Sequence, residues 1–173
     1  MHAFRCVSAS CVLAAFALAQ SASVTYYGLT CGPQPPSGSP KISVVGLPKL
    51  GSTIGISQRG VAVQVFQGCK WFGGEALALG TSRTQAFGIP LPFLIPFSFT
   101  EAFPCFVWTS SDLILPLAVI GDGRSITIPN DTRLIGMHVH LQWFVYYRND
   151  GVFCSPYFER WMTSDCADML IGT

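Results

Sequence analysis

Residues 137–147 read MHVHLQWFVYY, and this stretch decides the fold class. Successive side chains of a β-strand point to opposite faces of a sheet, so a strand alternates between two sets of residues. One set is apolar and comprises Val139, Leu141, Trp143 and Val145; the other comprises His138, His140, Gln142, Phe144 and Tyr146. We expect the first set to face a core and the two histidines to face solvent.

The rest of the chain repeats this pattern in shorter form. β-Branched or alternating runs are separated by turn residues such as Gly121-Asp122-Gly123 and Asn149-Asp150-Gly151, at intervals of about 8 to 12 residues. We expect at most one short helical turn, within residues 132–137 or 159–168, because apolar residues nowhere recur at helical spacing over three turns. The pattern predicts an all-β fold, a single antiparallel β-sandwich of Ig-like or jelly-roll-like form over residues 41–173.

The N-terminus is typical of a cleavable signal peptide. After Arg5, residues 6–19 carry no charge, and this run of about 14 residues is shorter than the ~20 that a membrane-crossing helix needs. Small residues precede two candidate cleavage points, after Ala19 and after Ser23. We favour the second, so that residues 1–23 form the signal peptide and residues 24–40 an N-terminal strand and a linker rich in proline, glycine and serine.

A second apolar stretch spans residues 87–108, but its prolines and Glu101 exclude a continuous membrane-spanning helix. The expected mature chain therefore has no membrane span and is placed outside the cytoplasm, in the extracellular space, on the cell surface or in the periplasm. Once Arg5 is removed with the leader, basic and acidic residues are equal in number. Such a balanced, lightly charged surface offers no basic face for the phosphates of nucleic acid.

Of the seven cysteines, Cys6 and Cys11 lie in the leader, and five remain. An oxidising compartment favours two disulfides and one leftover thiol, and fifteen pairings are possible. We favour Cys31 with Cys105 and Cys154 with Cys166. Cys69 would then be free or paired with another molecule.

Several segments together resemble a family of small secreted bacterial β-sandwich proteins of unknown function. The resembling segments are Gly46-Leu47-Pro48-Lys49-Leu50-Gly51, Ala78-Leu79-Gly80-Thr81-Ser82, Gly88-Ile89-Pro90-Leu91-Pro92, Pro104-Cys105, Ser111-Asp112-Leu113-Ile114-Leu115-Pro116, Ile128-Pro129-Asn130-Asp131 and Leu170-Ile171-Gly172. The resemblance implies an extracellular sandwich and carries no established activity. The chain departs from the family pattern at Cys69, Cys154 and Cys166, and in the aromatic residues near Trp143 and Trp161.

Few residues suggest chemistry. His138 and His140 share one face of a strand and are weak candidates for a metal site, since zinc would need further ligands from elsewhere in the chain. Trp161, which follows the charged residues Glu159 and Arg160, is the aromatic residue most expected to be exposed and to face a ligand. No local signature of a hydrolase, a zinc protease or a nucleotide-binding site is present, and no catalytic residue or cofactor is assigned.

The sequence therefore predicts a secreted, disulfide-stabilised, non-catalytic module with a structural or binding role and an unidentified protein or glycan partner. The alternatives are a carbohydrate-binding module that uses exposed aromatic residues and, third, a metal-dependent enzyme built on His138 and His140.

Overall fold

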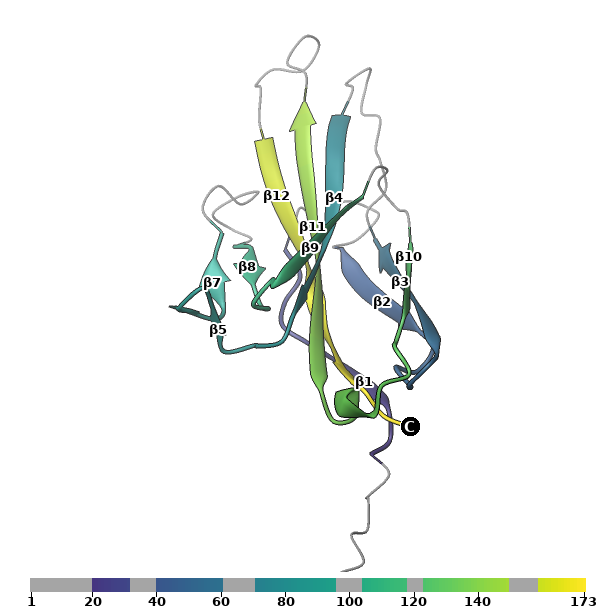
Figure 1. Cartoon of the computed structure of the whole chain (residues 1–173). Helices are drawn as coiled ribbons and strands as arrows, with labels where there is room; N and C mark the ends of the chain where they lie inside the picture. The colour runs from purple at the N-terminus through teal and green to yellow at the C-terminus, as the bar shows by residue number, and fades with distance from the viewer. Residues whose placement is uncertain (1–19, 32–39, 61–70, 96–103, 118–122, 150–158) are drawn as a thin grey trace, which may run out of the picture.

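The computed structural model describes residues 20–31, 40–60, 71–95, 104–117, 123–149 and 159–173 (Figure 1). Its strands are β1 (Ser23–Tyr27), β2 (Lys41–Val45), β3 (Thr53–Arg59), β4 (Trp71–Gly80), β5 (Gln85–Ala86), β6 (Ile89–Pro90), β7 (Phe93–Leu94), β8 (Phe106–Val107), β9 (Leu113–Leu117), β10 (Arg124–Thr127), β11 (His138–Asn149) and β12 (Glu159–Leu170). A single 3-10 turn, η1 (Thr132–Leu134), lies where a short helical turn was predicted. Among the described residues, no helix is long and apolar enough to cross a membrane.

The strands form antiparallel sheets, which confirms the predicted all-β class. A five-stranded sheet has the order β1-β12-β11-β4-β9, and a three-stranded sheet has the order β10-β3-β2. Two further sheets of two strands each, β5-β6 and β7-β8, complete the described elements. In Figure 1 the three-stranded sheet lies to one side of the long strands β4, β11 and β12, and β5, β7 and β8 lie to the other.

The core fills the space between the two larger sheets. Ile42, Ile54 and Ile56 of the three-stranded sheet pack in one cluster with Leu77, Leu141, Trp143, Ala167 and Met169 of the five-stranded sheet. Trp143 and Leu141 are fully buried there, as the alternation of β11 predicted. We call this side of the five-stranded sheet the inner face. Burial of each isoleucine, leucine or methionine of this cluster stabilises the fold by about 1.5–3 kcal/mol.

The opposite, outer face of the same sheet is covered as well. Gln142 points to this face and is fully buried. The backbone of β8 and of the residue after it lies over its side-chain amide and is hydrogen-bonded to it. Gln142 Nε2 donates to Phe106 O (2.9 Å) and Gln142 Oε1 accepts from Trp108 N (2.9 Å). The segment 81–112, as far as it is described, thus lies over the outer face; we call it the covering layer.

A disulfide holds the covering layer at a second point. Cys31 bonds to Cys105, directly before β8. Cys31 itself lies beside β12, where its N donates to Thr163 O (2.9 Å). The cross-link closes a loop of 74 residues, which on chain-entropy grounds restricts the unfolded state by about 4 kcal/mol.

The proposed pairing of Cys154 with Cys166 is wrong, since Cys166 is a free, buried cysteine. It lies in the middle of β12, opposite Tyr27 of β1 and Gln142 of β11, and no second cysteine of the described residues bonds to it. Cys69 and Cys154 lie outside the described residues, as do residues 1–19 of the expected leader and residues 32–39 of the expected linker.

The helical turn considered within residues 159–168 is also wrong, because these residues belong to strand β12. A β-bulge explains why the alternation there was hard to recognise. Gln142 pairs with Cys166 but Phe144 pairs with Thr163, so β12 has one extra residue at Ser164 and Asp165. The Ser164 hydroxyl accepts from Trp143 N (2.9 Å), and an Asp165 carboxylate oxygen accepts from Ile42 N (2.9 Å) of the other sheet.

A substitution at Gly80 can show whether the covering layer packs tightly against β4. A Cβ at this position would lie 2.8 Å from Ser110 N and still closer to the hydroxyls of Thr109 and Ser110, whereas a Cβ at Gly74 of the same strand would meet nothing within 4 Å. We expect Gly80→Ala to lower the free energy of unfolding by about 1–3 kcal/mol in urea titrations, and Gly74→Ala to cause no loss. Equal changes in the free energy of unfolding for the two substitutions would show that the covering layer does not pack closely against Gly80 of β4.

Candidate functional site

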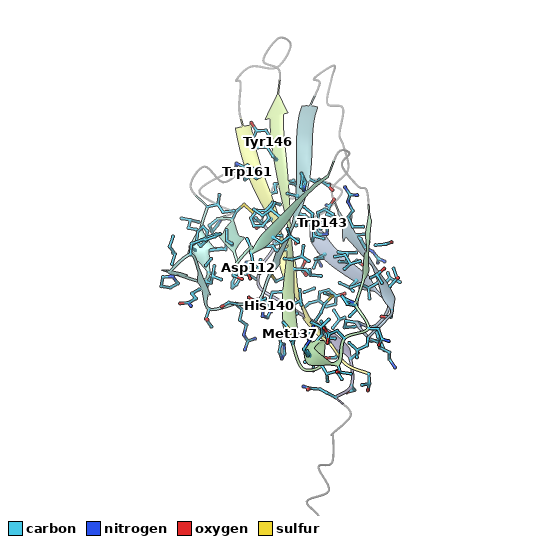
Figure 2. The ribbon with its side chains drawn as sticks, in the orientation of Figure 1. Asp112, Met137, His140, Trp143, Tyr146 and Trp161 are labelled. Atoms are coloured by element: carbon cyan, nitrogen blue, oxygen red, sulfur yellow. A yellow bond between two sulfur atoms is a disulfide. The ribbon has the colours of Figure 1, made fainter. Side chains whose placement is uncertain are left out.

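The outer face of the five-stranded sheet has an apolar end and a polar end. Tyr146 and Trp161 lie at the apolar end and His140 lies toward the polar end (Figure 2). Cross-strand pairing orders the residues between them: Phe144 lies opposite Ala76, Gln142 opposite Cys166, and His140 opposite Asp168. The covering layer crosses this face between the two ends.

At the apolar end, the sheet and the covering layer enclose an open pocket of about 290 Å³. Four lining residues come from the sheet, namely Ala76, Ile114, Phe144 and Trp161, and six from the covering layer, namely Ala86, Phe87, Phe93, Val107, Ser110 and Ser111. The wall is almost wholly apolar and contains three phenylalanines and one tryptophan. Its volume is close to the lower limit of ordinary small-molecule sites, roughly 300 Å³.

Both non-glycine residues with a positive φ in the described part of the chain line this pocket. Phe87 has φ +50° and Ser111 has φ +53°. Phe87 and Gly88 (φ +79°) form the two-residue turn between β5 and β6, a turn in which both positions favour Asn or Gly. A bulky residue in this conformation costs on the order of 1–3 kcal/mol.

Phe87 does not recover that cost by burial, because it is 85% exposed. Its ring stands at the mouth of the pocket, and the neighbouring elements carry further exposed apolar side chains, namely Ile89, Leu94 and Ile114. Exposed apolar side chains beside an apolar pocket favour a binding role for that pocket.

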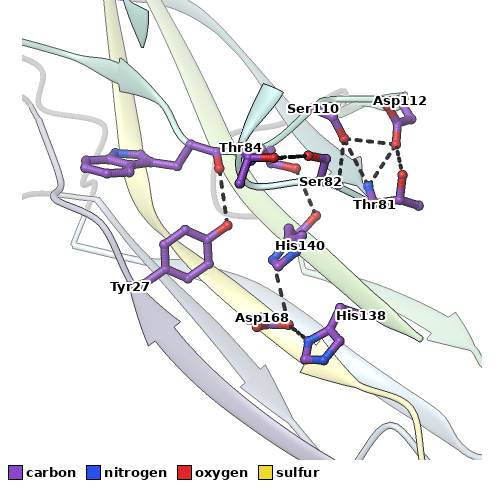
Figure 3. Close-up of polar contacts among 11 residues, drawn as sticks. Tyr27, Thr81, Ser82, Thr84, Ser110, Asp112, His138, His140 and Asp168 are labelled. Atoms are coloured by element: carbon purple, nitrogen blue, oxygen red, sulfur yellow. Dashed lines mark hydrogen bonds and ion pairs between the residues drawn. The ribbon is translucent and has the colours of Figure 1, made fainter. Parts of the chain in front are cut away.

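A hydrogen-bond network holds the second strained residue. Asp112 Oδ2 accepts from Thr81 N (2.8 Å), Thr81 Oγ1 (2.7 Å) and Ser110 Oγ (2.9 Å), as Figure 3 shows. These donors, the Thr81 hydroxyl above all, lower the pKa of the Asp112 carboxyl below its usual value. Ser111 lies between Ser110 and Asp112, so the network fixes the wall of the pocket where the covering layer enters β9.

Trp161 was the aromatic residue expected to face a ligand, and the structure places it in the pocket wall with 38% of its surface exposed. Its ring centroid lies 5.0 Å from that of Tyr146, which pairs with it across β11 and β12. Phe87, Phe144 and Ser111 were not predicted. Phe in a Phe-Gly hairpin turn, where Asn-Gly is usual, is the one local signal that pointed to Phe87.

At the polar end, Asp168 lies between two histidines. Its Oδ1 is 2.8 Å from His138 Nδ1 and 3.7 Å from His140 Nδ1 (Figure 3). The two side chains differ in exposure, 51% for His138 and 5% for His140. The prediction that both histidines face solvent is therefore wrong for His140, because Thr109 of the covering layer and the Tyr27 ring lie against it.

Burial lowers the pKa of His140, and the neighbouring Asp168 offsets part of that effect. Burial also disfavours the charged forms of Tyr27 and Cys166, which lie next to this cluster, but for these acids the pKa rises. Burial raises the pKa of the Tyr27 hydroxyl above its usual value and raises that of the Cys166 thiol to about 12. At neutral pH both groups stay protonated, and neither has the anionic character of an activated nucleophile.

The described residues supply no third ligand for a metal site at His138 and His140. Among the described residues, no three His, Cys, Asp or Glu side chains form a group that could hold a metal ion. His138 and His140 are stacked, with ring centroids 6.2 Å apart, and both direct Nδ1 toward the same carboxylate oxygen.

Comparisons of the chain with protein-family models, curated proteins and solved structures found no match.

The lowered pKa of His140 predicts a pH dependence of stability. The unfolded chain binds a proton at this residue near pH 6.5, whereas the folded chain does so only at lower pH. Stability is therefore complete above about pH 6.5 and is lost as the pH falls from there through the folded pKa. We expect unfolding free energies measured from pH 7.5 to 5 to fall less in His140→Gln than in the unmodified protein.

The matched control is His138→Gln, on the exposed side of the same carboxylate. This variant should retain most of the pH dependence, because burial and not the neighbouring imidazole is the main cause of the shift. A His140→Gln variant with an unchanged pH profile would contradict the assignment.

Proposed function

We propose that the protein is an exported, disulfide-stabilised, non-catalytic β-sandwich module that binds a small apolar ligand, or the apolar end of a larger one, in the pocket beneath Phe87. One observation carries this proposal. The two strained non-glycine residues of the described chain line the same apolar pocket, and one of them is a phenylalanine exposed to solvent. Strain that persists without a gain in packing supports a role in binding.

The composition of the pocket wall favours an apolar ligand over a sugar. A carbohydrate offers hydroxyl groups, each of which loses water on binding and needs a hydrogen-bond partner in the site. Of the lining residues, only Ser110, Ser111 and Trp161 carry side-chain polar groups, and Ser110 Oγ already bonds to Asp112, Thr81 and Ser82. The pair Tyr146 and Trp161 supplies an aromatic surface, which keeps a glycan as the second candidate ligand.

The concave shape favours a small ligand over a flat protein partner. Protein interfaces usually bury a broad surface of about 800 Å² on each side, whereas this site is a compact hollow between two layers. Support for location outside the cytoplasm comes from the disulfide between Cys31 and Cys105, since such bonds persist in oxidising compartments.

Phe87→Asn separates a binding role from a structural one. Asn tolerates the left-handed conformation that Phe87 adopts, so we expect the variant to be more stable by about 1 kcal/mol. The same variant should bind the apolar dye anilinonaphthalene sulfonate at least several-fold more weakly, because the ring at the pocket mouth is gone. Urea unfolding and dye fluorescence titration measure the two effects.

Leu47→Asn is the control, since Leu47 is exposed and apolar but lies in the turn between β2 and β3 of the other sheet. It should leave dye affinity unchanged. The proposal fails if Phe87→Asn binds the dye normally, or if it loses stability, which would make Phe87 a structural residue. Titration of the protein's tryptophan fluorescence with a cello-oligosaccharide tests the second candidate ligand, and saturable binding of the oligosaccharide would favour the glycan.

A further inference from the structure

The sequence offers two points at which the leader can be cleaved, and residues 20–22 lie between them. We propose that cleavage occurs after Ala19, so that the exported chain begins at Gln20 and residues 20–22 form part of the folded protein. This inference rests on the export that is part of the proposed function. It changes the preferred cleavage point from Ser23 to Ala19.

Residues 20–23 are bonded into the base of the fold. Thr173 N donates to Gln20 O (3.2 Å), and Ser23 forms the first cross-strand pair of β1, opposite Leu170. Cleavage after Ser23 would remove the acceptor of the Thr173 amide and shorten β1 by one residue at its start. Cleavage after Ala19 preserves both interactions.

Gly172 gives independent evidence that residues 20–22 belong to the mature protein. A Cβ at position 172 would collide with the backbone of Ala22 and Gln20, the nearest atoms being Ala22 N and Gln20 O. The φ angle of Gly172 lies outside the left-handed range, so the backbone conformation does not itself require glycine. The absence of a side chain at this position is needed because residues 20–22 lie over it.

Further contacts show that the chain around Gly172 packs closely against other segments of the fold. Gly172 N donates to Pro48 O (3.2 Å) and Leu50 N donates to Gly172 O (3.1 Å), so both backbone groups of the glycine are bonded on the side of the three-stranded sheet. Gly136, in the turn before β11, lies close to the side chain of Gln20. A Cβ at position 136 would lie 2.7 Å from Gln20 Oε1. Residues 20–22 therefore close a junction between the C-terminus, the loop after β2 and the turn before β11.

The chemistry of the step is the ordinary hydrolysis of one peptide bond. Water adds across the Ala19–Gln20 bond, which leaves a carboxylate on Ala19 and a new amino group on Gln20. Ala17 and Ala19 supply the small residues that signal peptidase requires at the third and first positions before the bond.

The test is to express the full chain with its own leader in an exporting host and to determine the N-terminus by intact mass and N-terminal sequencing. We expect a chain that begins at Gln20, either with a free amino group or cyclised with loss of ammonia. A chain that begins at Val24 would overturn the cleavage site and leave export intact. A chain retained at full length would overturn export itself.

Two matched leader variants make the assignment specific. Ala19→Leu places a large residue directly before the proposed bond and should abolish the Gln20 terminus. Ser21→Leu changes the third position before the alternative bond and should leave processing at Gln20 unchanged. The opposite pattern would overturn the proposal.

A stability measurement tests the structural reason. Gly172→Ala is introduced into two oxidised chains, residues 20–173 and residues 24–173, and the urea midpoint of each is measured. We expect the substitution to lower the midpoint in the longer chain and to have little effect in the shorter one, which should itself be less stable or fail to fold. Equal stability of the two unsubstituted chains would overturn the role assigned to residues 20–22.

Discussion

The arrangement of the outer face depends on the hydrogen bonds of the Gln142 side-chain amide. This amide projects from the middle of β11 and uses both its donor and its acceptor, bonding to Phe106 O and Trp108 N of the covering layer and also to Ser164 O (3.1 Å). A fully buried amide is tolerated only when its polar atoms are bonded. Gln142 therefore determines where the covering layer lies on the sheet, and the disulfide at Cys105 holds the adjoining residue.

The pocket is a consequence of this arrangement. Val107 lies between the two residues that Gln142 bonds, and Phe144 is the next residue of β11 on the same face, so the two walls of the pocket are brought together beside the amide. Phe87 and Ser111 then take strained conformations at its edge. The polar cluster of Asp168 with His138 and His140 lies on the other side of the amide, where the covering layer leaves His138 exposed and buries His140.

The residues of the inner face of the sheet could be predicted from the sequence, whereas those of the outer face could not. Alternation along β11 predicted correctly that Leu141 and Trp143 lie in the core, because strand geometry alone relates those positions. The same alternation assigned His140 to solvent, since nothing local shows that Thr109 and the Tyr27 ring lie against it. The bulge at Ser164 and Asp165 obscured β12, and Cys166 is a free cysteine within that strand instead of a member of the disulfide that spacing had suggested.

Hydrogen exchange at the Trp108 amide in Gln142→Met tests whether Gln142 holds the covering layer on the sheet, because methionine keeps the length of the side chain but removes its hydrogen bonds. We expect the Trp108 amide to exchange much faster than in the unmodified protein, while the amides of Leu141 and Trp143 in β11 stay protected. Unchanged protection of the Trp108 amide would contradict this role, because the covering layer would then be held without Gln142.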